Sequence, residues 1–199
     1  MAVNLQKGQK IDLTKGNPGL KHVMVGLGWD EVKKGGFLGG LLGGGQDIDC
    51  DASAILLSAP NDKLVNKGDL VYFGNLKHSS GSIKHMGDNL TGAGAGDDEQ
   101  IFVDLASVPQ NISKIIFVVN IYEATARKQD FGMIKNAFIR LVDSDTNQEL
   151  CRYNLSESYN GMTAMIFGEM YRHNNEWKFS AIGQGTSDDG LGALSRRYT

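Results

Sequence analysis

Residues 115–122 read Ile-Ile-Phe-Val-Val-Asn-Ile-Tyr, a nearly continuous apolar run that is rich in β-branched side chains. A strand with one face in water usually alternates between apolar and polar residues, whereas a strand covered on both faces does not. The run therefore predicts a central β-strand, buried on both faces, in a layered protein.

Shorter strand signals lie on both sides of this run. They are apolar or alternating segments that end at turn-forming residues: 22–27, 47–57, 70–73, 101–105, 136–142, 149–155 and 177–182. Many short strands with regular turns between them are typical of two packed sheets. Helix signals are few: residues 163–171 fit a helix or a strand, and residues 191–198 fit a short amphipathic helix. We predict an all-β fold, a two-sheet β-sandwich with a few short flanking helices, and a single domain over residues 1–199.

The composition excludes several classes of protein. With a net charge of −3 and no basic patch, the chain is not expected to bind nucleic acid. No apolar run reaches about 18 residues, so no transmembrane segment is expected. The N-terminus lacks the features of a signal peptide, and Cys50 and Cys151 stand far apart outside any Cys-x-x-Cys pattern. These features predict a cytoplasmic protein without a disulfide framework or a structural zinc site.

Residues 87–99 concentrate oxygen ligands. The segment reads Gly-Asp-Asn-Leu-Thr-Gly-Ala-Gly-Ala-Gly-Asp-Asp-Glu, and no Lys or Arg occurs between Lys84 and Lys114. Ca²⁺ takes about six to eight oxygen ligands, and glycines allow backbone carbonyls to turn toward an ion. The segment therefore predicts a calcium site, and the alternative interpretation is a solvated acidic turn.

A second acidic segment supports the same chemistry. With a period of two, Asp47, Asp49 and Asp51 share one face of a strand, and residues 35–62 contain no Lys or Arg. Like charges on one strand face destabilise a sheet unless water or a metal ion compensates them. The carboxylates of both segments suffice for two ions. Their spacing does not match an EF-hand loop, and Asp30 is a weaker candidate ligand.

Known enzyme motifs are absent from the sequence. The Gly-Ala-Gly-Ala-Gly run fails the dinucleotide pattern because Asp97 stands where the third glycine belongs, and neither a phosphate-binding Walker loop nor a Gly-x-Ser-x-Gly elbow occurs. His78 and His85 flank a Ser/Gly turn, where we expect surface residues or contacts to a metal or anion. We therefore predict that the protein is not an enzyme.

An apolar glycine-rich stretch covers residues 35–45. It predicts a mobile insertion between two strands. The alternative is a contact with a membrane or a partner, made by Phe37, Leu38, Leu41 and Leu42.

The string from Gly87 to Glu99 resembles the signature of the tellurium-resistance TerD family, and residues 5–13, 26–30 and 47–54 are also similar to that family. The resemblance implies a β-sandwich that binds two adjacent Ca²⁺ ions. It also implies a bacterial protein, cytoplasmic or peripheral at the inner membrane, linked to resistance to tellurite, phages and colicins and to general stress. The implied metal-site residues are Asp47, Asp49, Asp51, Asp88, Asn89, Gly92, Gly94, Gly96, Asp97, Asp98 and Glu99.

Three hypotheses follow for the function. The preferred one is a Ca²⁺-dependent scaffold or sensor in the stress response, whose partners are other tellurium-resistance proteins. The second is a metal-dependent enzyme that handles tellurium oxyanions, in its sharpest form by reduction of tellurite at Cys50 or Cys151. The third is a component of a membrane-associated stress complex.

Overall fold

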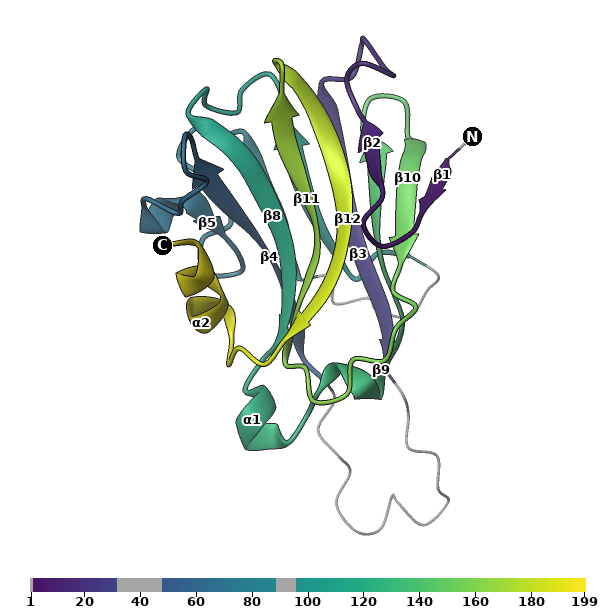
Figure 1. Cartoon of the computed structure of the whole chain (residues 1–199), viewed down its shortest axis with the longest axis vertical. Helices are drawn as coiled ribbons and strands as arrows, with labels where there is room; N and C mark the ends of the chain where they lie inside the picture. Colours follow the sequence, from purple (N-terminus) through teal and green to yellow (C-terminus); the bar gives the residue numbers. More distant parts are fainter. Residues whose placement is uncertain (1, 32–47, 89–95) are drawn as a thin grey trace.

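The structure is a computed structural model that describes residues 2–31, 48–88 and 96–199. For Glu31 and Asp88 it describes the backbone and not the side chain. Over these residues, two six-stranded sheets pack face to face (Figure 1). Sheet A has the order β1 (Val3–Leu5), β10 (Gln148–Asn154), β9 (Ile134–Asp143), β3 (His22–Glu31), β7 (Glu99–Asp104) and β6 (Ile83–Asp88). Sheet B has the order β2 (Lys10–Asp12), β12 (Glu176–Thr186), β11 (Ala164–His173), β8 (Ile112–Ile121), β4 (Cys50–Ser58) and β5 (Leu70–Val71).

Helical elements are short in the described parts of the chain. They are α1 (Ala124–Arg127), α2 (Leu191–Ser195) and the 3-10 turns η2 (Lys67–Asp69), η3 (Phe131–Met133) and η4 (Arg196–Tyr198). The predicted fold class, a two-sheet β-sandwich with a few short helices, is confirmed. None of the helices in the described ranges has the length and apolarity that a membrane crossing requires.

The central strand was correctly predicted. β8 lies between β4 and β11 and pairs with both in antiparallel register. Its residues Ile115, Phe117 and Val119 belong to the core between the sheets, while Ile116 and Val118 belong to a second apolar cluster on the outer face of sheet B. Burial on both faces explains why this segment is apolar almost throughout.

The outer apolar cluster of sheet B is covered by the C-terminal residues. Leu194 of α2 is fully buried against strand residues that include Ile55 and Ile116, and Leu191 and Tyr198 pack at its margin. The backbone N–H of Leu64 donates a 2.7 Å hydrogen bond to the carbonyl oxygen of Tyr198. Figure 1 shows α2 lying along β8 and β4 on this side of the sandwich.

The ambiguous segment 163–171 is a strand. β11 pairs with both β8 and β12, and its register shifts in both pairs between Ile166 and Gly168. A Cβ at Gly168 would lie 2.5 Å from the Phe179 ring, so this position needs glycine. The local sequence does not decide between helix and strand here, and pairing with a strand on each side makes the segment a strand.

Three strands had no clear sequence signal. β1 and β2 have three residues each and lie at sheet edges, and β6 lies at the far edge of sheet A. Short edge strands bury few side chains and therefore leave little periodicity. The apolar residues Phe37, Leu38, Leu41 and Leu42 lie outside the described residues.

We expect Leu194→Ala to lower the free energy of unfolding by about 2–4 kcal/mol, because it removes a fully buried side chain and leaves a cavity over sheet B. Chemical denaturation measures the change. Leu76→Ala is the control, because Leu76 is 47% exposed and its truncation should cost less than about 0.5 kcal/mol. Equal losses in the two variants would show that the C-terminal residues do not seal this face.

Candidate metal centre

The predicted acidic residues that the structure describes lie at one end of the sandwich. Here β3 and β6 end, and β4 and β7 begin. Leu27 of β3 and Asp88 of β6 are both register partners of Glu99, the first residue of β7. Three consecutive acids, Asp97, Asp98 and Glu99, therefore enter sheet A between its two neighbouring strands.

Asp97 lies on the outer face of sheet A and forms an ion pair with Arg140 of β9. The Arg140 Nε and Nη2 atoms donate hydrogen bonds of 2.7 and 3.0 Å to its two carboxylate oxygens, and Gln100 Nε2 donates a third at 3.0 Å. The Asp97 side chain is fully buried. Gly26 makes this arrangement possible, because a Cβ there would lie 2.3 Å from the Asp97 carboxylate.

Asp98 lies at the sheet margin and is half-buried. Its Oδ2 atom accepts a 2.6 Å hydrogen bond from the backbone N–H of Trp29. Burial raises the pKa of Asp98 despite this bond, and the negative charges of Asp30 and Asp97 raise it further. The Asp98 carboxylate is therefore held where its negative charge is only partly compensated.

Glu99 points in the opposite direction to Asp97, into the space between the sheets. It is 4% exposed, and its Oε2 atom accepts a 2.5 Å hydrogen bond from the Ala52 N–H of β4. The same oxygen lies 3.3 Å from Nε2 of His85, a buried residue of β6. The His85 Nε2 atom also lies 3.1 Å from the Ala52 carbonyl oxygen. Glu99 and His85 thus connect sheet A to the backbone of sheet B.

The charge of Glu99 acts on His85. Burial alone would lower the pKa of His85, but the hydrogen bond and charge of Glu99, together with the Ala52 carbonyl and the charge of Asp51, outweigh burial, and the net pKa is raised. The Gly87 N–H donates a 3.1 Å hydrogen bond to Nδ1 of His85, and this bond disfavours protonation of Nδ1. The contact with a buried carboxylate is the stronger of these two influences.

The sequence expectation that no cation neutralises these acids is corrected by two contacts. Arg140 pairs with Asp97 from 43 positions along the chain, and His85 pairs with Glu99. A stretch without Lys or Arg in the sequence can still lie beside a cation in space. The residue that sequence reasoning missed is Arg140, since nothing near it in the chain marks it as a partner.

The second acidic segment follows the predicted alternation where it is described. Cys50 begins β4 with its side chain toward the core, Asp51 is half-buried on the opposite face, and Asp49 is exposed before the strand. Asp51 therefore belongs to the outer face of sheet B, whereas Glu99 belongs to the interior. Gly96 is exposed. Asp47, Asn89, Gly92 and Gly94 lie outside the described residues, as does the Asp88 side chain.

Within residues 2–31, 48–88 and 96–199, no three His, Cys, Asp or Glu side chains converge as a metal-binding group. The donors compatible with Ca²⁺ are hard carboxylate oxygens near Asp98. A second carboxylate that acts on Asp98 is Asp30, whose Oδ2 accepts a 2.7 Å hydrogen bond from Asn136. An incompletely compensated, half-buried carboxylate next to a second carboxylate fits a hard cation.

A Ser–His–Asp chain of hydrogen bonds also occurs. His78 contacts Asp69 Oδ1 at 3.2 Å through Nε2 and Ser80 Oγ at 2.7 Å through Nδ1. The Ser80 hydroxyl also accepts the Ser82 N–H and contacts the Ser82 hydroxyl. These bonds close a tight turn whose backbone is held by the His78–Ile83 pair. They account for the turn, and they leave Ser80 Oγ poorly placed as a nucleophile.

The fold and this acidic end define a β-sandwich protein with a candidate cation site. The chain belongs to the TerD family, because the sequence model of the TerD domain matches residues 1–198. It is 57% identical to stress response protein SCP2 of Bacillus subtilis (strain 168), with all of both chains covered. It is 48% identical to tellurium resistance protein TerD of Serratia marcescens, covering 100% of this chain and 97% of the relative.

A solved structure shows the same fold. The crystal structure of a homologue of the telluride resistance protein TerD from Streptomyces coelicolor A3(2) superposes with a TM-score of 0.65 at 21% sequence identity, covering 91% of this chain and 99% of that chain. The family-model match and the identity to the Serratia marcescens relative confirm the predicted membership of the TerD family.

We expect His85→Gln to reduce the free energy of unfolding by about 3 kcal/mol at pH 6, because Glu99 loses its buried ionic partner. The folded-state pKa of His85 is raised, so its contribution is fully present below the unfolded value of about 6.5 and is lost as the pH rises through the folded value. Denaturation of both proteins from pH 6 to pH 9 should show the difference narrowing. A difference that widens with pH would contradict the charged pair.

Proposed function

We propose that this member of the TerD family is a Ca²⁺-binding stress-response protein that acts as a scaffold or sensor and not as an enzyme. The observation that supports it best is Asp98, a half-buried carboxylate with a raised pKa beside Asp30 and Asp97. It lies two residues after the glycine-rich segment 87–96, whose sequence supplies further oxygen ligands.

The described contacts refine the proposed ligand set. Asp97 and Glu99 already have protein partners in Arg140 and His85, so we assign them a structural role at the start of β7. Asp51 is left out of the set because it lines a hollow on the outer face of sheet B. The proposed ligands are then Asp47, Asp49, Asp88, Asn89 and Asp98, together with carbonyl oxygens of Gly92, Gly94 and Gly96. Four carboxylates balance the four positive charges of two Ca²⁺ ions, so two ions remain the proposal.

Bound calcium would supply positive charge at the point where the glycine-rich segment meets sheet A. The residues of the chain make that point rigid. Arg140 holds Asp97 from the outer face, and Ala52 and His85 hold Glu99 from the inner face, so Asp98 stands between two fixed neighbours. A ligand at Asp98 is thereby coupled to both sheets, which is the property that a sensor requires.

We expect calcium to raise the thermal midpoint of the wild-type protein and to raise that of Asp98→Asn less. At a hundredfold excess over Kd, binding adds about 2.7 kcal/mol, a shift of about 5–10 °C for a chain of this size. In chelator, Asp98→Asn should melt at or above the wild-type temperature, because Asn keeps an acceptor for the Trp29 N–H and removes a poorly compensated charge. The measurement is a melt with Ca²⁺ and with chelator.

Asp104→Asn is the matched control, because Asp104 lies at the opposite end of β7 and bonds to Ser107. It should lose some stability and keep the full calcium response. Identical wild-type midpoints in Ca²⁺ and in chelator would end the calcium proposal. If calcium raised the thermal midpoint of Asp98→Asn as much as that of the wild type, Asp98 would not be a calcium ligand.

The reductase hypothesis is disfavoured by the two cysteines. Both are buried thiols outside any disulfide, and burial raises the pKa of the Cys151 thiol to about 12. A thiol with that pKa is almost entirely protonated at neutral pH, and the thiolate is the reactive species. The hypothesis of a membrane-associated complex rests on residues 37–42 and remains a proposal.

We expect the native protein to resist iodoacetamide at pH 8, with Cys151 modified at least a hundredfold more slowly than in denaturant. Mass spectrometry of Cys50→Ser, which leaves Cys151 alone, measures the rate. Cys151→Ser reports on Cys50 in the same way. Rapid alkylation of either cysteine in the folded protein would support the reductase hypothesis.

A further inference from the structure

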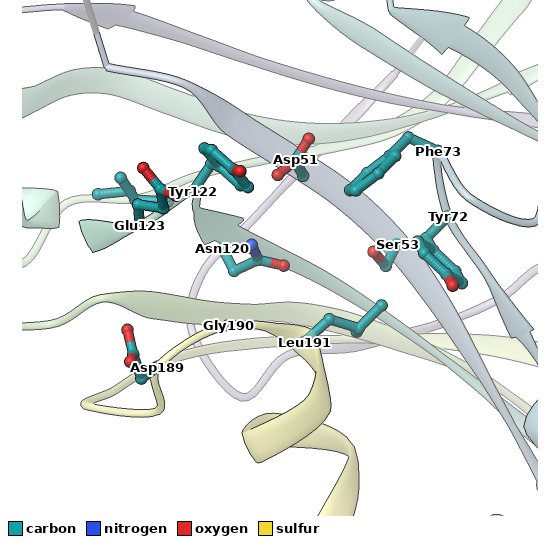
Figure 2. Close-up of a pocket in the computed structure, with 11 residues that line it drawn as sticks. Asp51, Ser53, Tyr72, Phe73, Asn120, Tyr122, Glu123, Asp189, Gly190 and Leu191 are labelled. Carbon is teal, nitrogen blue, oxygen red and sulfur yellow. The ribbon is translucent and has the colours of Figure 1, made fainter. Parts of the chain in front are cut away.

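The cover that the C-terminal residues provide on the outer face of sheet B ends at Leu191. Beyond it, a hollow of about 310 Å³ opens between the start of β4, the end of β8, the residues after β5 and the turn before α2. Figure 2 shows the side chains of Asp51, Ser53, Asn120 and Phe73 around this hollow. It lies on the face of β4 opposite to Ala52, and therefore on the opposite side of sheet B from Glu99.

The floor of the hollow carries two polar side chains that the protein leaves without partners. Asp51 and Asn120 are register partners on β4 and β8, and Ser53 is two residues further along the same face. Asn120 is 6% exposed and Ser53 is 1% exposed, and neither Asn120 Oδ1 nor Ser53 Oγ has a hydrogen-bond partner. Figure 2 shows the Asn120 oxygen and the Ser53 hydroxyl facing each other beside Leu191.

Buried polar atoms are nearly always hydrogen-bonded, so two such atoms in one hollow indicate a missing donor. An amide oxygen only accepts hydrogen bonds, and a hydroxyl accepts as well as donates. A ligand that satisfies the Asn120 oxygen must therefore present an N–H or O–H group toward the sheet, and the Ser53 hydroxyl can accept from the same group.

The walls of the hollow are aromatic. Tyr72 and Phe73 pack edge to face with ring centroids 5.3 Å apart, and the Phe73 side chain is 57% exposed. On the other side Tyr122 is 41% exposed, and the Cζ atom of the Arg127 guanidinium lies 4.9 Å from the centroid of its ring, in a cation–π contact. Exposed aromatic faces attract cations, and guanidinium groups bind them well.

The charge of the rim selects the same kind of ligand. The acids Asp51, Glu123 and Asp189 line the hollow, and no Lys or Arg is among the described residues that line it. Arg127 pairs with Glu123 at 3.4 Å, and Asp189 accepts a 3.2 Å hydrogen bond from Thr125. The surplus of negative charge repels phosphate and tellurium oxyanions. The aromatic walls suit an organic cation better than a hydrated metal ion, whose ligands would be oxygens.

We propose that this hollow binds a small organic cation, an alkylammonium or guanidinium compound. Its N–H groups satisfy Asn120 and Ser53, its charge is met by the acidic rim, and its apolar stem lies against Tyr72 and Phe73. The site is separate from the calcium site proposed above and does not depend on it.

The test is a titration of the full chain, in chelator, with agmatine, n-butylammonium and n-butanol, followed by calorimetry and by the backbone amide signals of Ser53 and Asn120. Agmatine and n-butylammonium should bind saturably and shift both signals. n-Butanol has the same stem without the charge and should bind at least tenfold more weakly. Because chelator is present throughout, a negative result here leaves the calcium response unaffected, and the reverse also holds.

Two variants locate the site. Phe73→Ala removes an exposed wall and should weaken agmatine at least fivefold without harm to folding. Asn120→Leu extends the apolar face and should weaken it at least tenfold. Leu76→Ala, an exposed apolar residue outside the hollow, should bind agmatine as the wild type does.

Four results would overturn the proposal. The first is no binding of either cation, with an ordered water found between Ser53 and Asn120 instead. The second is equal binding of n-butanol, which would make the hollow merely apolar. The third is binding that neither Phe73→Ala nor Asn120→Leu weakens. The fourth comes from a separate titration without chelator: shifts of these two signals that Ca²⁺ produces and the organic cations do not, which would make the hollow a metal site.

Discussion

The structure depends on how it compensates the charge of Glu99. This carboxylate starts a strand of sheet A and yet points between the sheets, where an isolated charge would be costly. His85 and the Ala52 N–H meet it there, from the neighbouring strand and from the opposite sheet. Removing one partner of such a buried pair leaves the other uncompensated, so the three groups act as a unit. They fix the distance between the sheets at the end of the sandwich that carries the acidic segments.

The three consecutive acids of this segment have three different surroundings. Asp97 is held by Arg140 on the outer face, Glu99 is held in the interior, and Asp98 is left between them with a raised pKa. Acids crowded in the sequence are therefore not automatically the ligands of one ion. Two of them provide a fixed frame, and the third retains the electrostatic character of a ligand. This division removes Asp97 and Glu99 from the proposed calcium ligands and keeps Asp98.

The sequence predicted the buried strands well and the edges poorly. Residues 115–122 were assigned correctly because burial on both faces leaves a continuous apolar run, and the alternation at Cys50 and Asp51 was correct because each strand face has a different environment. The strands β1 and β2 were missed because they have only three residues each, and β6 was missed because, at a sheet edge, it contains only two large apolar residues, Ile83 and Met86. The strand β11 stayed ambiguous until its two partners were known.

The candidate site was predictable only in part, since sequence shows acids and not what faces them. The pairing of Asp97 with Arg140 joins strands that are far apart in the chain, and Gly26 matters only because that carboxylate lies over it. Ser53 and Asn120 could not be recognised from the sequence either. Each stands in an apolar strand, and their isolation follows from where α2 stops covering sheet B.

The strand pairing determines how early each sheet can be completed while the chain is being synthesised. β1 lies parallel to β10, with Val3 opposite Cys151, and β2 lies beside β12, with Ile11 opposite Phe179. A nascent polypeptide emerges from the ribosome with its N-terminal residues first, so these two strands wait for partners that are translated near the end. Such distant pairings slow folding and leave strand edges open to other chains meanwhile. Both sheets therefore keep an unpaired edge until β10 and β12 have been synthesised.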